Sequence, residues 1–314
     1  SITLALAVAR DMEALCPRAD LLDVTNPMPR VVTALRRFSS LRAFGFCNAA
    51  QGGRSGYERA AQWALGAAPG PEAVAAAANL AVVTAGLNHF AWFLSVRDRR
   101  SGADLMPRMA ESVARGQDRA HALLRRWQAR YGGLAACAPD HTAEFLPQEP
   151  DARYHTHPPY HGTPAERRDR WRELRQVAAG RLHWRRAETL VSWEHPVDFA
   201  VALARRQSLD LPMLNFPNDG CIPSLPAGRI VEAPARLEGG KLAGLPVVLP
   251  PRVAELCRVV SDVHELVAEG VARHDRRLLR RAVEADPAVA DKAPALAALD
   301  DLLDAHADLC PFPR

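Results

Sequence analysis

The sequence places a cysteine and a histidine, each next to an asparagine, directly after two separate apolar segments. Cys47-Asn48 follows the segment LRAFGF, and Asn88-His89 follows AVVTAGL. A thiolate and a neutral imidazole are good ligands for a borderline divalent transition metal, and a catalytic metal keeps coordination positions open for a substrate. A structural interpretation competes with this one, because a cysteine at the end of a buried strand is often a small core residue.

A loop rich in proline and histidine carries other residue types that could do chemistry. Its sequence, CAPDHTAEFLPQEPDARYHTHPPYHGT, includes Asp140, His141 and Tyr154. Carboxylate, imidazole and phenol groups beside a cleft can act as general acids or bases. Histidine-rich loops also face water or bind metal adventitiously, so the residue types alone leave both interpretations open.

The period of the apolar residues predicts the elements that must position these groups. Residues 3–15 show the three- and four-residue spacing of an amphipathic helix. A short strand is expected at 21–24, and Asn26-Pro27 then indicates a helix start, a capping side chain followed by proline at the first helical position. The following helix and a second strand within 41–47 complete a βαβ unit, whose two strands are parallel.

Polar side chains follow three predicted strands at the point where each strand ends: Asn26, Cys47-Asn48 and Asn88-His89. Open α/β sheets bind their ligands outside the carboxyl ends of the strands. We therefore expect these side chains, far apart in sequence, to share one crevice.

The rest of the chain shows helical patterns around a region of short strands. A hairpin-like edge is expected beyond Trp92, and strand-like runs at 229–232 and 247–249 lie in a segment rich in proline and glycine. Helices are predicted at 57–65, near 107, at 116–130, 164–187, 197–207, 253–267, 274–284 and 293–306.

Composition is typical of a globular protein, with 48% hydrophobic and 24% charged residues among 314. A net charge of +4, spread over helices that also carry acidic residues, gives no support for binding nucleic acid or membranes. The six cysteines have no paired spacing, which favours a reducing compartment, and we expect the cytoplasm. No transmembrane helix is expected, because the longest apolar stretch, 73–87, is shorter than a span of about 20 residues.

The start of the chain suggests a fragment. Ser1 lies inside a predicted helix, with no initiator methionine. If that helix is a crossover from an earlier strand, the first part of the sheet lies upstream. The glycine-rich pieces QGGRSG and LEGGKLAG lack the G-x-G-x-x-G spacing of a dinucleotide-binding loop, so we expect weak or no NAD binding by this chain alone.

Seven stretches, taken in order, resemble glycoside hydrolase family 4: ARDMEALCP, LLDVTNPMPRVVTAL, GFC, GLNHFAWF, HTAEFLP, NFPNDGCIPSLPAGRIVEAPA and ALDDLLDAH. The resemblance implies an α/β fold, with the remainder of a Rossmann-type doubly wound parallel sheet in 1–86 and a larger α+β, lactate-dehydrogenase-like domain in 87–314. It further implies a homodimeric or homotetrameric hydrolase of small-molecule glycosides that uses NAD and a divalent metal, manganese first, an exception to the two-carboxylate scheme.

The resemblance also implies a mechanism and the residues for it. NAD would take a hydride from C3 of the sugar, a metal would stabilise the charge that develops when the C2 proton leaves, and the aglycone would depart by elimination. Cys47 and His89 match the metal ligands of the family. Asn26 matches an asparagine expected near cofactor and substrate, and Asn48 and Asn88 are expected on the sugar.

The catalytic base and the substrate stay open at this point. Asp140 or His141 falls where the family has acid–base residues, and Tyr154 is the alternative base. Asn48 is typical of the 6-phospho-β-glucosidase branch, whereas HTAEFLP is closer to the branch that acts on unphosphorylated galactosides or uronides. Two other functions compete: an NAD-dependent 2-hydroxy-acid dehydrogenase on the same scaffold, which needs no metal, and a non-catalytic relative.

Overall fold

The computed structural model describes residues 1–47, 56–147, 163–186, 196–308 and 312. The chain forms two compact units, one made of residues 1–152 and 194–314 and the other of residues 153–193. Within the smaller unit the described elements are helix α8 (Pro164–Ala178) and the 3-10 turn η1 (Trp184–Arg186). Among the described helices, none is long and apolar enough to cross a membrane.

The first part of the chain folds as the predicted βαβ unit. Strand β1 (Asp20–Asp23) pairs in parallel with β2 (Arg42–Gly45), and helix α2 (Met28–Phe38) connects them. Helix α1 (Ile2–Leu15) precedes β1 and packs against α2. The prediction of this unit is confirmed, except that α2 begins one residue later, because Pro27 is the N-cap and not the first helical residue.

The described strands form one mixed sheet in the order β1-β2-β6-β7-β3-β4-β5, with β8 paired to β7. Its other strands are β3 (Leu80–Leu87), β4 (Phe90–Asp98), β5 (Leu134–Ala135), β6 (Leu209–Pro217), β7 (Ile230–Glu238) and β8 (Lys241–Gly244). The mixed α/β class is confirmed, and in the described part of the chain only β1 and β2 pair in parallel. The expectation that Asn88-His89 ends a parallel strand is therefore wrong, because β3 is antiparallel to both of its neighbours.

A single lateral row of residues joins four strands near the middle of the sheet. Gly45 at the end of β2 is paired with Asn215 of β6, which is paired with Glu232 of β7. Glu232 is paired in turn with Gly86, near the end of β3. Position 45 requires glycine, since a Cβ atom there would lie 2.7 Å from Met28 Sδ and 3.0 Å from Asn215 Cβ. This row brings the carboxyl ends of β2 and β3 to the same part of the molecule.

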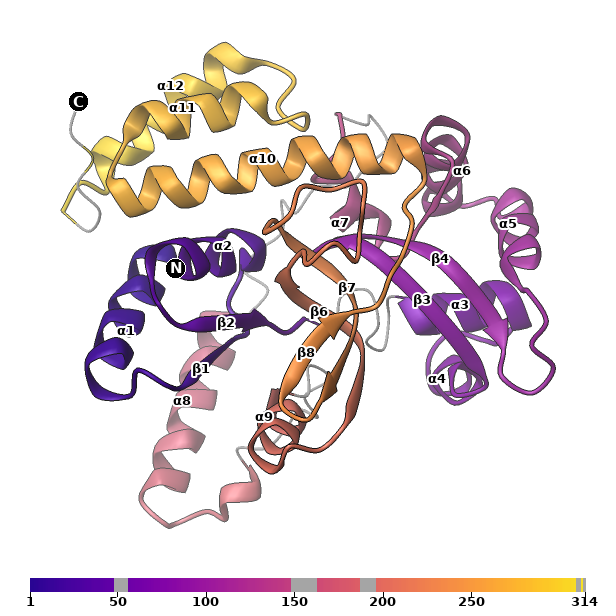
Figure 1. Ribbon diagram of the computed structural model, residues 1–314, viewed down its shortest axis with the longest axis horizontal. Coiled ribbons are helices and arrows are strands. Elements are labelled where there is room, and N and C mark those ends of the chain that lie inside the picture. Colours follow the sequence, from indigo (N-terminus) through magenta and orange to yellow (C-terminus); the bar gives the residue numbers. More distant parts are fainter. Residues whose placement is uncertain (48–55, 148–162, 187–195, 309–311, 313–314) are drawn as a thin grey trace. The chain divides into compact units, whose positions relative to one another are not determined.

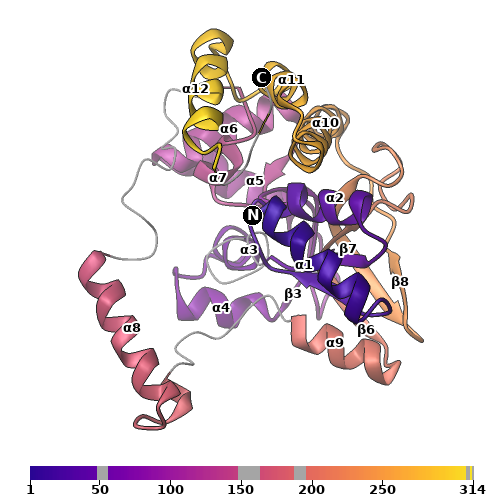
Figure 2. The ribbon, with the colours of Figure 1, turned by 90° about the vertical axis from the view of Figure 1, so that its left-hand side faces the viewer.

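Helices pack along the sheet and form a layer of their own near the carboxyl terminus. Helix α10 (Pro251–Arg273) packs against α2 and against α11 (Arg276–Ala285), and α12 (Lys292–Ala305) packs on α11. Figure 1 shows α10 between α2 and this outer pair, and Figure 2 views α10 and α11 nearly end-on. The remaining helices of the larger unit are α3 (Gly56–Leu65), α4 (Pro71–Ala77), α5 (Met106–Arg115), α6 (Arg119–Tyr131), α7 (Pro139–Ala143) and α9 (Pro196–Arg205).

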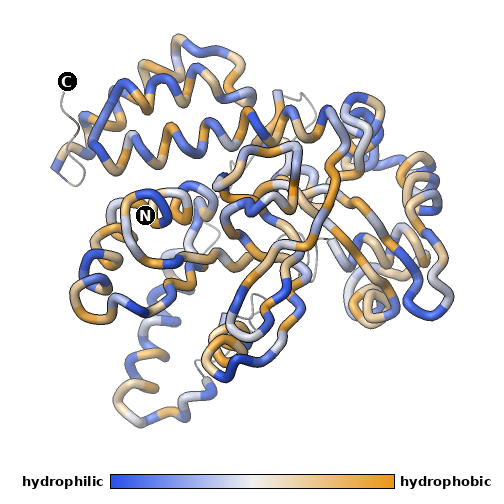
Figure 3. Tube along the Cα trace, viewed as in Figure 1, coloured by the Kyte–Doolittle hydropathy of each residue, from blue (hydrophilic) through white to orange (hydrophobic). Residues whose placement is uncertain are grey.

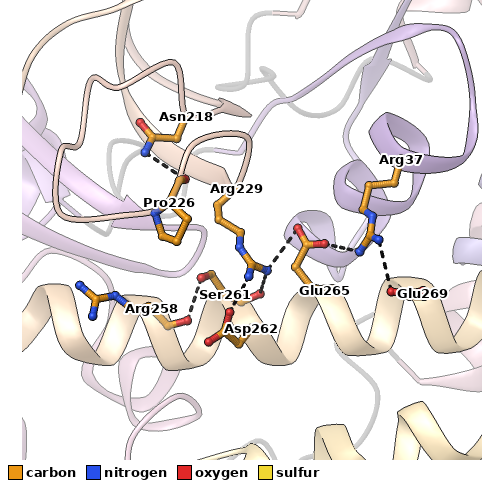
Figure 4. A network of polar contacts seen from close by, with 9 residues as sticks. All are labelled: Arg37, Asn218, Pro226, Arg229, Arg258, Ser261, Asp262, Glu265 and Glu269. Carbon is orange, nitrogen blue, oxygen red and sulfur yellow. Dashed lines mark hydrogen bonds and ion pairs between the residues drawn. The ribbon is translucent and has the colours of Figure 1, made fainter.

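An ion-pair network fixes α10 against α2 and against the start of β7 (Figure 4). Arg37 of α2 reaches Glu265 at 2.5 Å and Glu269 at 3.2 Å on α10. Arg229, the residue before β7, reaches Asp262 at 2.6 Å and Glu265 at 3.4 Å. Because Glu265 contacts both arginines, the start of β7 and helix α2 are held to the same turn of α10.

The loop between β6 and β7 is organised by one buried side chain, Asn218. Its Nδ2 donates to the carbonyl oxygens of Ile222 at 3.0 Å and Leu225 at 2.9 Å, and its Oδ1 accepts from the backbone N–H groups of Gly220 and Ile222 at 3.2 and 3.1 Å. These contacts replace backbone partners that a proline-rich segment cannot supply. The motif NDGCIPSLP is thus a structural feature that shapes the entry into β7.

Most predicted elements are present, with a few exceptions. Helix α8 ends at Ala178 and not at 187, α7 lies where the sequence predicts a loop, and α4 is not predicted. Other exceptions lie in the proline-rich segment before α10. In Figure 3 the strands in the middle of the sheet carry both apolar and polar residues, and the sequence does not predict β6 because Pro212 and Pro217 indicate a loop. The register of β6 on β7 shifts between Leu211 and Leu214, an irregularity that accommodates Pro212. The strand predicted at 247–249 is wrong, because the hairpin partner of β7 is β8, which ends at residue 244.

Candidate functional site

Cys47 and His89 meet in the folded chain, 42 residues apart in sequence. The Sγ atom of Cys47 lies 3.3 Å from Nε2 of His89. Cys47 follows the end of β2, His89 lies in the turn between β3 and β4, and both side chains are half-buried. The structure therefore brings together the two residues that the sequence predicts as metal ligands, while their ligand role stays a prediction.

The turn that carries His89 is short and conformationally demanding. Leu87 pairs with Phe90, which leaves Asn88 and His89 as a two-residue hairpin loop. His89 has φ 61°, the left-handed region in which a residue with a Cβ atom is disfavoured by roughly 1–2 kcal/mol. Gly86 has φ 149°, and a Cβ atom there would lie 2.5 Å from the carbonyl oxygen of Phe90. The backbone around His89 is thus fixed by the hairpin.

A fully buried carboxyl group, that of Glu232, lies beside this turn. Its Oε2 accepts hydrogen bonds from Nδ2 of Asn88 at 2.7 Å and from Nδ2 of Asn215 at 2.9 Å. Burial raises the pKa of Glu232 to about 7, and the two amide hydrogen bonds offset this increase only in part. Asn88 itself is buried, so its predicted contact with a sugar stays a prediction.

His141 lies next to the Cys47–His89 pair, and Asp140 contacts an arginine. The ring centroids of His141 and His89 are 5.0 Å apart. Both carboxylate oxygens of Asp140 accept from Arg119, at 2.8 and 3.1 Å, in a bidentate ion pair. Of these two predicted acid–base candidates on α7, His141 therefore faces the metal-ligand pair, and Asp140 ties α7 to the start of α6.

Of the other predicted site residues, Asn26 has no described contact with the Cys47–His89 pair, and two lie outside the described residues. Asn26 is exposed after β1, where its Oδ1 accepts from the backbone N–H of Met28 at 3.4 Å. Asn48 and Tyr154 lie outside the described residues. Their predicted roles, and that of Asn26 near a cofactor, stay predictions.

The geometry of the Cys47–His89 pair fits two ligands of one ion. With the bond lengths known for Zn²⁺, about 2.3 Å to sulfur and about 2.0–2.1 Å to nitrogen, two ligands of one ion at angles of roughly 90–110° lie about 3.1–3.6 Å apart. The observed 3.3 Å falls in this interval. Within the described ranges no group of three or more His, Cys, Asp or Glu side chains could hold a metal. Burial raises the pKa of the nearby Cys137 well above its ordinary value.

The sequence does not single out Glu232, Asn215 or Arg119. A signal for the first exists, because RIVEAPARL puts one carboxylate inside an apolar strand-like run, where a buried charge is costly. Asn215 occupies a similar position in LNFP. For Arg119 the sequence offers no signal, since it is one of many arginines on amphipathic helices.

The fold and the site define an α/β protein with a βαβ unit and a paired thiol and imidazole beside it. Residues 84–289 match the family 4 glycosyl hydrolase C-terminal domain, and residues 1–62 match the family 4 glycosyl hydrolase model. The chain belongs to family 4 of the glycosyl hydrolases, and the resemblance seen in the sequence is confirmed.

Known relatives extend beyond this chain. An α-galactosidase from Bacillus subtilis (strain 168) is 24% identical over 324 residues, covering 97% of this chain and 69% of the relative. A 6-phospho-α-glucosidase from gut microorganisms, solved in complex with NAD and Mn²⁺, has a TM-score of 0.71 at 20% identity and covers 100% of this chain and 73% of its own. A 6-phospho-β-glucosidase from Thermotoga maritima, solved with manganese, NAD⁺ and glucose-6-phosphate, has a TM-score of 0.66 at 16% identity over 98% and 73% of the two chains. The chain thus spans about two thirds to three quarters of these relatives.

Proposed function

We propose that this chain carries the metal-binding core of a glycosidase that depends on NAD and a divalent metal. The single observation that carries the proposal is the 3.3 Å separation of Cys47 Sγ and His89 Nε2 in a family 4 chain. Two structural neighbours, solved with NAD and manganese, support the choice of cofactor and metal. The conformation of His89 adds support, because glycine would serve its φ of 61° at lower cost.

The chain offers residues for the metal and for part of the dinucleotide site. When bound, NAD accepts and returns a hydride at C3 of the sugar, and the divalent metal stabilises negative charge on the C2 and C3 oxygens. Cys47 as thiolate and His89 as neutral imidazole would hold the metal, and the positions that they leave open would take sugar oxygens. The start of α2 after Asn26, at the carboxyl end of β1, would face the dinucleotide, as in other α/β nucleotide-binding proteins.

His141 is the described residue that we assign as general base for the C2 proton. Its ring lies 5.0 Å from that of His89, centroid to centroid, so a sugar held by the metal pair would lie within its reach. The ion pair between Arg119 and Asp140 fixes the first turn of α7 and thereby orients His141. Once the C2 proton is removed from a ketone-activated sugar, the electron pair left on C2 forms a C1=C2 double bond, and the glycosidic oxygen leaves C1 with the electron pair of the broken C1–O bond.

The substrate class is an O-glycoside, and the relatives offer two groups of candidates. One is an α-galactosidase, and two are named for 6-phosphoglucosides. Activity should therefore be measured on p-nitrophenyl α-galactoside and on the phosphorylated α- and β-glucosides, each with NAD and Mn²⁺.

The metal-ligand pair is tested by Cys47→Ser and His89→Ala, with His306→Ala as the matched control, because His306 is exposed outside the site. Calorimetric titration with Mn²⁺ should show binding by the parent and the control and none by the other two variants, all with unchanged circular dichroism. With the corresponding 3-keto sugar supplied directly, so that no NAD is needed, hydrogen exchange at C2 in heavy water should follow the same order. Mn²⁺ binding that survives both substitutions would refute the proposal.

A further inference from the structure

We propose that Glu232 is a positioning residue that holds the Asn88-His89 turn so that His89 can share a metal with Cys47. The inference rests on the proposed function, since it assigns a role toward the same metal pair. Glu232 touches neither of the two ligands in the described contacts, and it acts through Asn88, the neighbour of His89 in the chain.

The hydrogen bonds of Glu232 join two strands and the turn. One oxygen, Oε2, accepts from Asn88 at 2.7 Å and from Asn215 at 2.9 Å. All three side chains are buried, with Glu232 at 0% exposure, Asn215 at 1% and Asn88 at 2%. Without the carboxylate both amides would lose this acceptor away from water, at about 1–3 kcal/mol for each unsatisfied group. Turning Asn88 out to satisfy its amide would move His89.

The lateral row explains why this contact sets the distance between the ligands. Gly45, Asn215, Glu232 and Gly86 are paired one after another across four strands. Cys47 follows the first member of the row by two residues, and His89 follows the last by three. The strand pairing sets the spacing between the two backbones, and the bond from Asn88 to Glu232 sets the orientation of the turn relative to that row.

The buried carboxylate is not a feature that stability alone favours. An acid taken out of water lowers the free energy of unfolding unless strong partners compensate, and the hydrogen-bond partners of Glu232 among the described residues are two neutral amides. A second oxygen, Oε1, is buried with no hydrogen-bond partner among the described atoms. The start of β7 is also held by Arg229, which pairs with Asp262 and Glu265 on α10 (Figure 4), so Glu232 has a rigid base. Buried hydrogen-bond partners behind metal ligands are known to tune metal affinity.

The test compares Glu232→Leu, which removes the acceptor, with Glu232→Gln, which keeps one acceptor oxygen in a side chain of the same shape. Cobalt(II) is the probe, because its absorption bands report both thiolate ligation and the geometry around the ion. We expect Glu232→Leu to bind Co²⁺ roughly 10- to 100-fold more weakly, with altered bands at saturation. Glu232→Gln should restore the affinity to within about threefold of the parent, as expected when the hydrogen-bond geometry is kept.

The matched control is Glu58→Leu, since Glu58 is also buried but accepts from the backbone N–H of Gly70 at 2.7 Å, at the start of α4. It should lower the melting temperature and leave the cobalt affinity and spectrum unchanged. If Glu232→Leu does not fold, Asn88→Ala removes the same bond from the other side and should weaken Co²⁺ binding in the same range. Unchanged cobalt affinity and bands in folded Glu232→Leu or Asn88→Ala would overturn the inference, as would equal losses in the Leu and Gln variants. If Cys47→Ser also leaves cobalt binding unchanged, the failure lies in the metal pair itself.

Discussion

Replacing Glu232 with glutamine should make the stability of this protein less dependent on pH. Burial raises the pKa of Glu232 from 4.5 to about 7 in the folded chain, whereas the unfolded chain titrates near 4.5. Between these values the folded state holds a proton that the unfolded state has lost, so the free energy of unfolding falls as pH rises from about 4.5 to about 7. Glutamine resembles the protonated acid and does not titrate.

The magnitude follows from the shift. Each pKa unit is worth about 1.4 kcal/mol, so the raised value corresponds to a cost of about 3 kcal/mol once the carboxylate is ionised. Because the group is fully buried, this value is not reduced by solvent screening. The variant should therefore match the parent near pH 4.5 and exceed it by about 3 kcal/mol above pH 7.

The assay is urea unfolding followed by circular dichroism at several pH values from 4.5 to 8.5, with EDTA present so that no metal contributes. The difference in free energy of unfolding between variant and parent isolates Glu232, since other titrating groups are common to both. A difference that stays constant across this pH range, or one that grows toward acid pH, would refute the reasoning.

Two further substitutions test the fold around the site. Burial, with Arg30 and Arg229 nearby, lowers the pKa of His264 to about 3, so this neutral histidine contributes stability above pH 6.5 that is lost as pH falls. The free energy of unfolding of the unmodified protein should fall by about 2 kcal/mol between pH 6.5 and 5. In His264→Phe, urea unfolding should not show this fall. An equal pH dependence in both proteins would contradict the neutral state of His264. Gly86→Ala places a Cβ atom 2.5 Å from the carbonyl oxygen of Phe90, at a backbone φ of 149°. The melting temperature should therefore fall by an amount equivalent to a few kcal/mol of unfolding free energy. An unchanged melting temperature would contradict the predicted clash.

The sequence predicts the local elements well because their signals are local. The apolar period of α1 and α10 and the Asn26-Pro27 helix start depend on neighbours within a few residues, and each is confirmed to within a few positions. Strand β6 has no such signal, because its Pro212 is accommodated by a register shift that only the partner strand β7 makes possible. The resemblance to family 4 rests on short motifs in order along the chain, and it too is confirmed.

The site was predictable in part. Residue type and family resemblance select Cys47 and His89 from the sequence. The expected placement at the carboxyl ends of parallel strands is wrong for His89, because β3 is antiparallel to its neighbours. His141 and Asp140 are adjacent in sequence and equivalent there, and only the contact with Arg119 separates their roles. The sequence could not make this distinction, because the partner lies on another helix.

The sequence by itself determined which side chains are available for chemistry, where most helices and the βαβ unit begin and end, and which family the chain resembles. The tertiary structure alone decided that a thiol and an imidazole 42 residues apart lie 3.3 Å from each other, with a buried carboxyl group behind their turn. The physical reason is that strand pairing across Gly45, Asn215, Glu232 and Gly86 joins four segments distant in sequence. Such pairing depends on backbone hydrogen bonds that almost any residue can make, so the sequence carries little record of which strands will meet.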